Sequence, residues 1–303
     1  MPVYASVPLP ILKSLSASPP HGPLWPLPLE ANASLTPMPS RSMTISSPSP
    51  ASVTQLIGRV ALVTGAARGI GLATVVQMAQ SGMRIVAFDR PGADWGEVRL
   101  AGASELLEVE GDAGSSADWE RLLQSTLEKF GQLDVLVNNA GISGAICPLI
   151  DYPDEIFDEV MRVNARGVFL GLKHGARAMK GRGGSIVNVS SVSGIGGGRF
   201  VAGYTASKHA VVGMTKLAAT ELAAEGIRVN AVCPSPTSTE MTLAMERESH
   251  DPDAVRRAMT RVIPLGRYAE ASEIANLILF LASDASSFMT GTAIPIDGGL
   301  KAA

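Results

Sequence analysis

Cysteine is scarce in this sequence, and the two cysteines, Cys147 and Cys233, are far apart. Neither belongs to a CxxC pair, and no histidine stands near either one at the spacing of metal ligands. The scarcity excludes a disulfide framework and a cysteine-based zinc site, and it is typical of a reducing compartment. We therefore expect no bound metal and two buried cysteines that act as small hydrophobic residues.

Basic residues and long hydrophobic runs are also lacking. The formal charge is −3, and no run of basic residues exceeds Arg256-Arg257, whereas nucleic-acid binding calls for a basic patch or stripe. The best apolar stretch after the first 54 residues, Leu277 to Ala282, is far shorter than the about 20 residues that span a bilayer. We expect neither a nucleic-acid partner nor a membrane, and we expect a cytoplasmic location.

Residues 1–54 are poor in glycine and charge and rich in proline. They hold one glycine, three charged side chains and 12 of the 20 prolines. Without a hydrophobic period of 2 or 3.6, they cannot bury enough apolar surface to offset the entropy lost on ordering. We predict a disordered extension over residues 1–54 and one folded domain over residues 55–303. Prolines interrupt its apolar runs and no charged segment precedes them, so no secretory signal is predicted. Two alternatives stay open, an organellar transit peptide and translation that starts at Met38 or Met43.

A glycine-rich turn follows the first strand-like run of the folded domain. Residues 59–64 form a short apolar, β-branched run, and the turn after them carries Gly65, Gly69 and Gly71. Apolar residues then recur at helical spacing from Leu72 to Ala79. Glycines in such a turn let backbone N–H groups approach a pyrophosphate at the positive end of the helix. The arrangement predicts a dinucleotide-binding unit.

The second strand-like run, residues 84–88, ends in Asp89. In a dinucleotide-binding unit, a carboxylate at this place accepts hydrogen bonds from the ribose hydroxyls and repels the 2′-phosphate of NADP. The sequence therefore favours NAD, although the basic neighbours Arg68 and Arg90 act in the opposite direction.

Strand-like and helix-like segments alternate through the rest of the domain. Repeated βα units predict an α/β fold, a single doubly wound Rossmann-type domain with a parallel sheet of about seven strands and helices on both faces. Ligands of such folds lie at the carboxyl ends of the strands. The predicted strands are 106–110, 133–138, 185–190, 228–233 and a last one near Ile296, and the predicted helices are 116–130, 153–179 and 202–224, with a helical segment within 236–263.

Tyr204 and Lys208 stand one helical turn apart at the start of the predicted helix 202–224, so both project from one face. A phenol with a pKa of about 10 is a poor base at neutral pH, and a nearby ammonium group favours its phenolate form. Alone, such a pair is more often a surface aromatic beside a solvated lysine. Its significance comes from the motifs that accompany it.

Together these motifs resemble the short-chain dehydrogenase/reductase family over residues 58–303. The family's TGxxxGxG turn is found at Thr64 to Gly71, its NNAG segment at Asn138 to Gly141, its helix asparagine at Asn164, its serine at Ser191 and its YxxxK pair at Tyr204 and Lys208. The resemblance implies an oxidoreductase that transfers a hydride between a nicotinamide cofactor and a secondary alcohol or ketone.

The resemblance also implies catalytic roles for four residues. Tyr204 is expected to be the general acid and base, and Ser191 to hydrogen-bond the same substrate oxygen. Lys208 is expected to lower the pKa of Tyr204 and to bind the nicotinamide ribose. Asn164 is expected to hold a water that links Lys208 to solvent.

Further positions match the family's cofactor cleft. After the sixth strand the family usually has Pro-Gly, whereas this chain has Pro234-Ser235, and the added Cβ restricts the backbone there. The resemblance implies cofactor contacts by Gly65, Arg68, Gly69, Ile70, Gly71, Asp89, Asp112, Ala113, Asn138, Ala140, Gly141, Tyr204, Lys208, Pro234, Thr237 and Thr239. For the asparagines, hydrogen bonds that stabilise the sheet are an alternative role.

The stretch 236–263 corresponds to the family's mobile lid over the substrate. Among the segments that flank the catalytic residues, Arg199 is the one obvious cation, so we expect a neutral secondary alcohol or ketone with a cyclic or apolar body. We further expect a homotetramer or homodimer. Two alternatives are a 3-oxoacyl thioester reductase that uses NADPH and a catalytically silent dinucleotide-binding regulator, against which the complete catalytic set argues.

Overall fold

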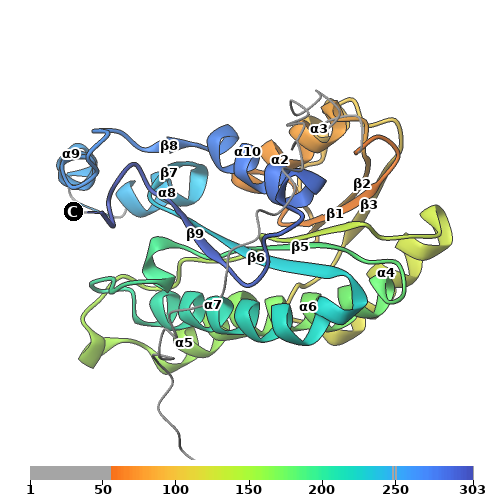
Figure 1. Ribbon diagram of the computed structural model, residues 1–303. Coiled ribbons are helices and arrows are strands. Elements are labelled where there is room, and N and C mark those ends of the chain that lie inside the picture. The colour runs from red at the N-terminus through yellow and green to blue at the C-terminus, as the bar shows by residue number, and fades with distance from the viewer. Residues whose placement is uncertain (1–55, 248, 250, 303) are drawn as a thin grey trace, which may run out of the picture. The chain divides into compact units, whose positions relative to one another are not determined.

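A computed structural model describes residues 56–247, 249 and 251–302 of the protein (Figure 1). The extension predicted over residues 1–54 lies outside this described part. The strands are β1 (Val60–Thr64), β2 (Arg84–Asp89), β3 (Leu106–Glu110), β4 (Val135–Asn138), β5 (Gly184–Val189), β6 (Ile227–Pro234), β7 (Thr237–Ser238), β8 (Ala269–Glu270) and β9 (Ala293–Ile296). The α-helices are α2 (Gly69–Gln80), α3 (Gly96–Arg99), α4 (Ser116–Phe130), α5 (Asp154–Val160), α6 (Gly167–Met179), α7 (Ala202–Leu222), α8 (Glu240–Arg247), α9 (Pro252–Arg261) and α10 (Ala271–Ala282).

Seven strands form one parallel sheet in the order β3-β2-β1-β4-β5-β6-β9, and β7 pairs with β8 separately. The predicted doubly wound α/β fold is therefore confirmed. The strand order reverses between β1 and β4, and in such sheets the crevice at this reversal is where ligands bind. The glycine turn after β1 lies at that reversal.

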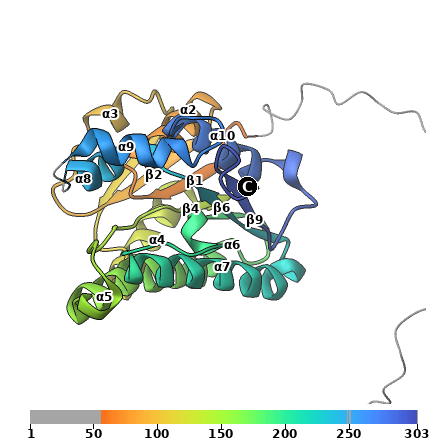
Figure 2. The same ribbon diagram turned by 90° about the vertical axis from the view of Figure 1, so that its left-hand side faces the viewer.

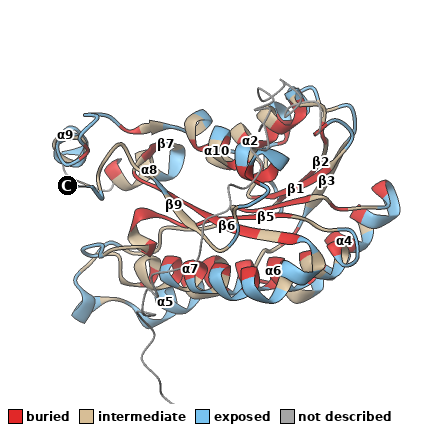
Figure 3. Cartoon of the chain, viewed as in Figure 1, coloured by how far each residue is buried: buried red, intermediate tan, exposed pale blue. Residues whose placement is uncertain are grey.

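Helices cover both faces of the sheet because successive strand residues point to opposite sides (Figure 1). In β1, Ala61 and Val63 pack toward α2 and α10, whereas Val60 and Leu62 pack toward α4, α6 and α7. The inner strands of the sheet are consequently buried along most of their length, the edge strands β3 and β9 are only half-buried, and the outer faces of the helices are exposed (Figure 3). This double burial explains the nearly continuous apolar strands.

The helix predicted over 153–179 is not continuous. It consists of α5, one π-helical turn, η2 (Met161–Arg166), and α6. A π-helical turn accommodates an extra residue in the helix and is frequent at functional sites. Here it contains Asn164, so the interruption changes where this residue points.

The sequence analysis assigned no element to residues 271–282, which form α10. Its apolar run is too short for periodicity to distinguish a buried helix from a buried strand. A capping box between Glu270 and Glu273 starts the helix, and each side chain accepts a hydrogen bond from the other residue's backbone N–H. Helix α10 packs beside α2 on one face of the sheet.

The segment predicted as a lid forms helices α8 and α9 at the carboxyl edge of the sheet. Figure 2 faces this edge and shows α8 and α9 on one side of it and α5 on the other. Within the described residues, we find no helix with the length and apolarity needed to cross a bilayer. The same residues contain no group of three or more His, Cys, Asp or Glu side chains that is suited to hold a metal ion.

Candidate active site

The glycine turn between β1 and α2 is tightly closed. Gly65 and Gly69 have φ angles of 64° and 57°, in the left-handed region that favours glycine. A Cβ at Gly71 would overlap the carbonyl oxygen of Gly65, and a Cβ at Gly65 would lie 2.9 Å from Nδ2 of Asn139. The first turn of α2 carries no acidic residue. A backbone cradle at a helix start without a competing carboxylate fits a pyrophosphate.

We expect Gly71→Ala to damage this cradle. The new methyl group would displace the backbone of Gly65, and overpacking of this kind typically costs about 1–3 kcal/mol. Unfolding in urea should show this loss, and calorimetric titration with NAD should show at least tenfold weaker binding. Gly213→Ala is the matched control because a Cβ on this helical glycine meets nothing within 4 Å. If Gly71→Ala bound NAD as well as Gly213→Ala does, the assigned role of the cradle would be refuted.

A second set of hydrogen bonds, which was not predicted from the sequence, joins the glycine turn to the residues that follow β4. Oγ1 of Thr64 accepts hydrogen bonds of 3.0 Å from the backbone N–H groups of both Asn139 and Ala140. Nδ2 of Asn139 donates to the carbonyl oxygens of Thr64 and Gly65 at 2.9 and 3.0 Å. The sequence signal for these hydrogen bonds is that Thr64 and Asn139 stand at the ends of two strands, because the carboxyl ends of parallel strands meet at one edge of the sheet.

The predicted ribose-binding carboxylate, Asp89, lies beside this turn. Its Oδ2 accepts a hydrogen bond of 2.9 Å from Ala67 N–H, and its Oδ1 accepts one of 2.8 Å from Arg90 N–H. The side chains of Arg68 and Arg90 belong to exposed residues. The structure therefore places one carboxylate against the cradle and leaves both nearby cations toward solvent.

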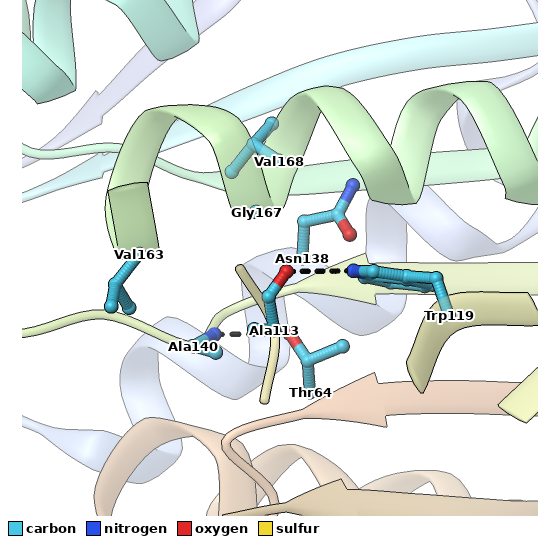
Figure 4. Close-up of a pocket in the computed structure, with 8 residues that line it drawn as sticks. All are labelled: Thr64, Ala113, Trp119, Asn138, Ala140, Val163, Gly167 and Val168. Carbon is cyan, nitrogen blue, oxygen red and sulfur yellow. Dashed lines mark hydrogen bonds between the residues drawn. The ribbon is translucent and has the colours of Figure 1, made fainter. Parts of the chain in front are cut away.

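Ala113, Ala140, Asn138 and Thr64 line a narrow hollow behind the turn (Figure 4). The indole N–H of Trp119 donates to the carbonyl oxygen of Ala113 at 2.8 Å, and the hollow has no room for a water-sized sphere. Nδ2 of Asn138 donates to Oδ1 of Asn188 at 2.8 Å. The Asn138 side chain is therefore part of the sheet interior, as one of our two interpretations had it, and only its backbone is left for a ligand.

Ser191 and Tyr204 approach each other from different elements. Ser191 follows β5, and its Oγ accepts a hydrogen bond of 3.1 Å from Ser193 N–H, which leaves the hydroxyl hydrogen free to donate. Tyr204 lies in the first turn of α7. Burial raises the pKa of Tyr204, and the neighbouring Ser191 hydroxyl lowers it in part.

Lys208 lies below Tyr204 and is buried. Its Nζ donates a hydrogen bond of 2.8 Å to the carbonyl oxygen of Val189 and lies 5.5 Å from the centre of the Tyr204 ring. Burial lowers the pKa of Lys208 to about 8. The Lys208 ammonium group is thus bonded to β5 and lies close to the Tyr204 ring.

Asn164 connects three segments of the site. Its Oδ1 accepts a hydrogen bond of 2.8 Å from Ile142 N–H, and its Nδ2 donates to the carbonyl oxygen of Ile142 at 2.9 Å and to Oγ of Ser207 at 3.1 Å. A Cβ at Gly141 would lie 3.1 Å from this Oδ1 and 3.6 Å from Nζ of Lys208. Both amide hydrogens of Asn164 are thus used in these hydrogen bonds. A relay water would have to donate to the second lone pair of Asn164 Oδ1 or bond to the main chain.

The loop after β6 tolerates Ser235 without strain. Ser235 does not have a positive φ angle, so the backbone at this position does not require glycine. Oγ1 of Thr237 donates to the carbonyl oxygen of Ser235 at 3.0 Å, and a Cβ at Gly69 would lie 3.3 Å from Cγ2 of Thr239. The loop that starts at Pro234 therefore reaches back over the glycine turn.

A buried carboxylate holds the two lid helices together. Glu246 on α8 is 7% exposed, and it accepts hydrogen bonds of 3.3 and 3.0 Å from Nε and Nη2 of Arg256 on α9. The guanidinium carbon lies 5.7 Å from the centre of the Tyr268 ring. The lid is therefore a closed unit with its own ion pair.

We expect Glu246→Gln to loosen the lid, raise the KM for substrate severalfold and lower the Tm by a few degrees. The Arg256 hydrogen bonds lower the pKa of Glu246 from 4.5. Because the folded-state pKa is lowered, this stabilisation is present above pH 4.5 and is lost as the pH falls through the lower value. Thermal unfolding against pH checks the sign. Glu240→Gln, which removes the exposed partner of Arg247, is the control, and an equal effect of both variants would contradict the expectation.

Comparison with known proteins agrees with this geometry. Residues 65–301 match the family described as Enoyl-(Acyl carrier protein) reductase. The (+)-borneol dehydrogenase 2 of Salvia officinalis is 40% identical over 81% of this chain and 90% of its own length. The chain is a short-chain dehydrogenase/reductase. The predicted family membership is confirmed.

Solved structures of the family superpose over most of this short-chain dehydrogenase/reductase. Levodione reductase has a TM-score of 0.79 and 37% identity, and the match covers 82% of this chain and 99% of that one. NAD+-bound xylitol dehydrogenase has a TM-score of 0.76 and 36% identity, with 81% and 100% covered. The protein is an NAD(P)-dependent oxidoreductase that acts on alcohols or ketones.

Proposed function

We propose that the protein transfers a hydride between NAD(H) and a neutral secondary alcohol or ketone with a cyclic or apolar body. The observation that carries the proposal is that Tyr204 lies beside Ser191 and Lys208, while Lys208 and Asn164 both approach Gly141. The carboxyl edge of the sheet is also where the glycine turn fits a dinucleotide. Substrate oxygen and cofactor would therefore lie side by side.

The residue roles follow from the free hydrogens and charges of the site. The nicotinamide, when bound, supplies or accepts the hydride. In ketone reduction, Tyr204 gives its phenolic proton to the carbonyl oxygen, and Ser191 donates a hydrogen bond to that same oxygen. In alcohol oxidation, the phenolate of Tyr204 takes the proton of the substrate hydroxyl, and Ser191 hydrogen-bonds to that same oxygen. Lys208 supplies the positive charge near the phenolate and can turn from Val189 toward the ribose hydroxyls.

Three observations support NAD as the preferred cofactor. Asp89 stands at the cradle with both oxygens directed at backbone N–H groups, where a 2′-phosphate would meet a negative charge. Arg68 and Arg90 are exposed, and within the described part of the chain neither side chain forms an ion pair with Asp89. The similar xylitol dehydrogenase structure holds NAD+. The remaining proposed contacts with the cofactor come from residues of the glycine turn and of the loops after β3, β4 and β6: Gly65, Gly69, Ile70, Gly71, Asp112, Ala113, Asn138, Ala140, Gly141, Pro234, Thr237 and Thr239.

The loops beside the catalytic residues support a substrate with an apolar body. Cys147 N–H donates to the carbonyl oxygen of Phe200 at 2.9 Å, which joins the loop after β4 to the loop before α7. Ile146 and Phe200 on these loops are both partly exposed. Borneol, named in one relative, is a neutral cyclic alcohol. The side chain of Lys301 approaches Gly196, so the sequence analysis missed one cation near this loop.

The test is a screen of secondary alcohols and ketones with both nucleotides, followed by absorbance of the reduced cofactor. Turnover of a neutral cyclic alcohol or ketone with NAD(H) is expected. Turnover of 3-oxoacyl thioesters with NADPH instead would favour the alternative of a 3-oxoacyl thioester reductase, the activity named in a similar Thermotoga maritima protein. Cofactor binding without turnover of any substrate would favour a silent dinucleotide-binding regulator.

We also propose that the protein is a homodimer or homotetramer. Phe169 on α6 and Leu217 on α7 are 50% and 56% exposed, and large exposed apolar side chains on neighbouring helices favour contact with a second copy. Light scattering of the purified protein measures its mass directly, and a monomer would refute this assembly.

A further inference from the structure

Two arginines of the π-helical turn η2 flank Asn164 in the sequence, and the assignments above use neither. Arg162 and Arg166 both reach the loop after β3. Nη1 of Arg162 lies 2.5 Å from Oδ2 of Asp112, and Nη1 of Arg166 donates to the carbonyl oxygen of Gly114. The loop that we propose to contact the adenosine half is thus held by the same turn that carries Asn164.

The position of Arg162 is itself fixed from behind. Its Nε and Nη2 donate to the two carboxylate oxygens of Glu159 at 2.6 and 2.8 Å. This fork geometry holds the guanidinium in one plane, so its remaining Nη1 points at Asp112. A Cβ at Gly114 would overlap this Nη1, which shows how closely the loop backbone approaches the arginine.

The loop closes around these contacts. The Oδ1 of Asp112 accepts a hydrogen bond of 2.8 Å from Gly114 N–H, and a Cβ at Gly167 would lie 3.1 Å from the carbonyl oxygen of Ala113. Ala113, Val163 and Gly167 line the hollow shown in Figure 4. The shape of the loop after β3 is therefore set by η2 and the start of α6 as much as by β3 itself.

We propose that Arg162 is a positioning residue for the adenosine half of the cofactor, and that it acts by holding and neutralising Asp112. The proposal rests on the proposed NAD site. Asp112 and Arg162 are 42% and 37% exposed, and exposed ion pairs add little to stability. The contribution of this pair therefore lies in keeping a carboxylate from repelling the phosphates and in fixing the loop.

The experiment compares Arg162→Gln with the wild type by calorimetric titration of AMP and NMN, the two halves of NAD. We expect about tenfold weaker AMP binding, NMN binding within twofold of wild type, and little change in Tm. Because the Trp119 indole bonds to Ala113, fluorescence should report AMP binding independently. Arg99→Gln is the matched control, since Arg99 makes a bidentate pair with Glu108 beside the same strand.

A double-mutant cycle shows whether Arg162 acts through Asp112. In an Asp112→Asn background, adding Arg162→Gln should weaken AMP binding by less than twofold. An equal loss in both backgrounds, unchanged AMP binding in Arg162→Gln, or equal losses for AMP and NMN would each overturn the inference. A wild-type protein that binds neither AMP nor NAD would instead refute the proposed function on which it rests.

Discussion

Tyr204→Phe should lower kcat by at least about a thousandfold, within the range by which general acid–base groups accelerate reactions, while NAD still binds. The phenol proton is the one that moves to or from the substrate oxygen in the proposed reaction, and phenylalanine keeps the ring that packs near Lys208. Steady-state rates with saturating substrate measure the first effect, and calorimetric titration with NAD measures the second.

The matched control is Tyr152→Phe. The Tyr152 hydroxyl is buried without a hydrogen-bond partner within the described part of the chain, and a Cβ at Gly203, next to Tyr204, would lie 3.0 Å from it. Removing this hydroxyl should change kcat by less than about threefold, since no hydrogen bond is lost. Unchanged turnover in Tyr204→Phe would refute the proposed mechanism.

The same phenol predicts opposite pH dependences for the two directions. Because burial raises the pKa of Tyr204, the protonated form dominates at neutral pH. Ketone reduction uses this form, so its rate should fall as the pH rises through the Tyr204 pKa. Alcohol oxidation uses the phenolate, so its rate should rise over the same range. Profiles of kcat/KM in both directions should therefore cross, and parallel profiles would contradict the assignment of Tyr204.

Asp89→Asn should shift the cofactor preference from NAD toward NADP by up to roughly 1000-fold, since two like charges about 4 Å apart repel by about 4 kcal/mol at an effective dielectric constant of 20 and about 1.4 kcal/mol is a factor of ten. The amide removes the negative charge that would face the 2′-phosphate, and its oxygen can still accept a hydrogen bond from Ala67 N–H. The exposed Arg68 and Arg90 can then attract the phosphate without an opposing negative charge at residue 89. The ratio of kcat/KM values with the two nucleotides measures the shift.

Glu110→Gln provides the comparison for this variant. Glu110 pairs with Asp89 in the register of β2 and β3, so its replacement removes a carboxylate from the end of the neighbouring strand. We expect the nucleotide ratio to change by less than about threefold. Tighter binding of NADP than of NAD by the wild-type protein would show that the interpretation of Asp89 is incorrect.

Much of the fold could be predicted because both faces of the sheet are covered. Runs such as Val60–Thr64 and Val135–Asn138 are apolar along nearly all of their length, and each is followed by turn residues. Other features left no such trace. The π-helical turn η2 looks like ordinary helix in the sequence, because an extra residue in one turn hardly disturbs a 3.6-residue pattern. Helix α10 was missed because its apolar residues lack clear periodicity.

The positions of the site residues were predictable, but several of their contacts were not. Tyr204 and Lys208 stand out through their spacing and Ser191 through the family resemblance, and the fold brings the three close together. Spacing does not reveal that the Lys208 ammonium group bonds to Val189, because a backbone carbonyl has no sequence signal. The pairing of Arg162 with Asp112 joins segments that are distant in the sequence, and it too appears only after folding.

By itself, the sequence determined the parallel α/β fold, and it placed the glycine turn and the Tyr204–Lys208 pair that we propose as the cofactor turn and part of the acid–base site. These depend on local patterns, since a glycine turn, an apolar strand and a helical Tyr-Lys pair each act within a few residues. Only the tertiary structure decided that burial raises the pKa of Tyr204, and that Asn164 bonds to Ile142 and Ser207 while Arg162 bonds to Asp112. Desolvation and long-range hydrogen bonds depend on what surrounds a group in space, and that surrounding exists only once the chain has folded.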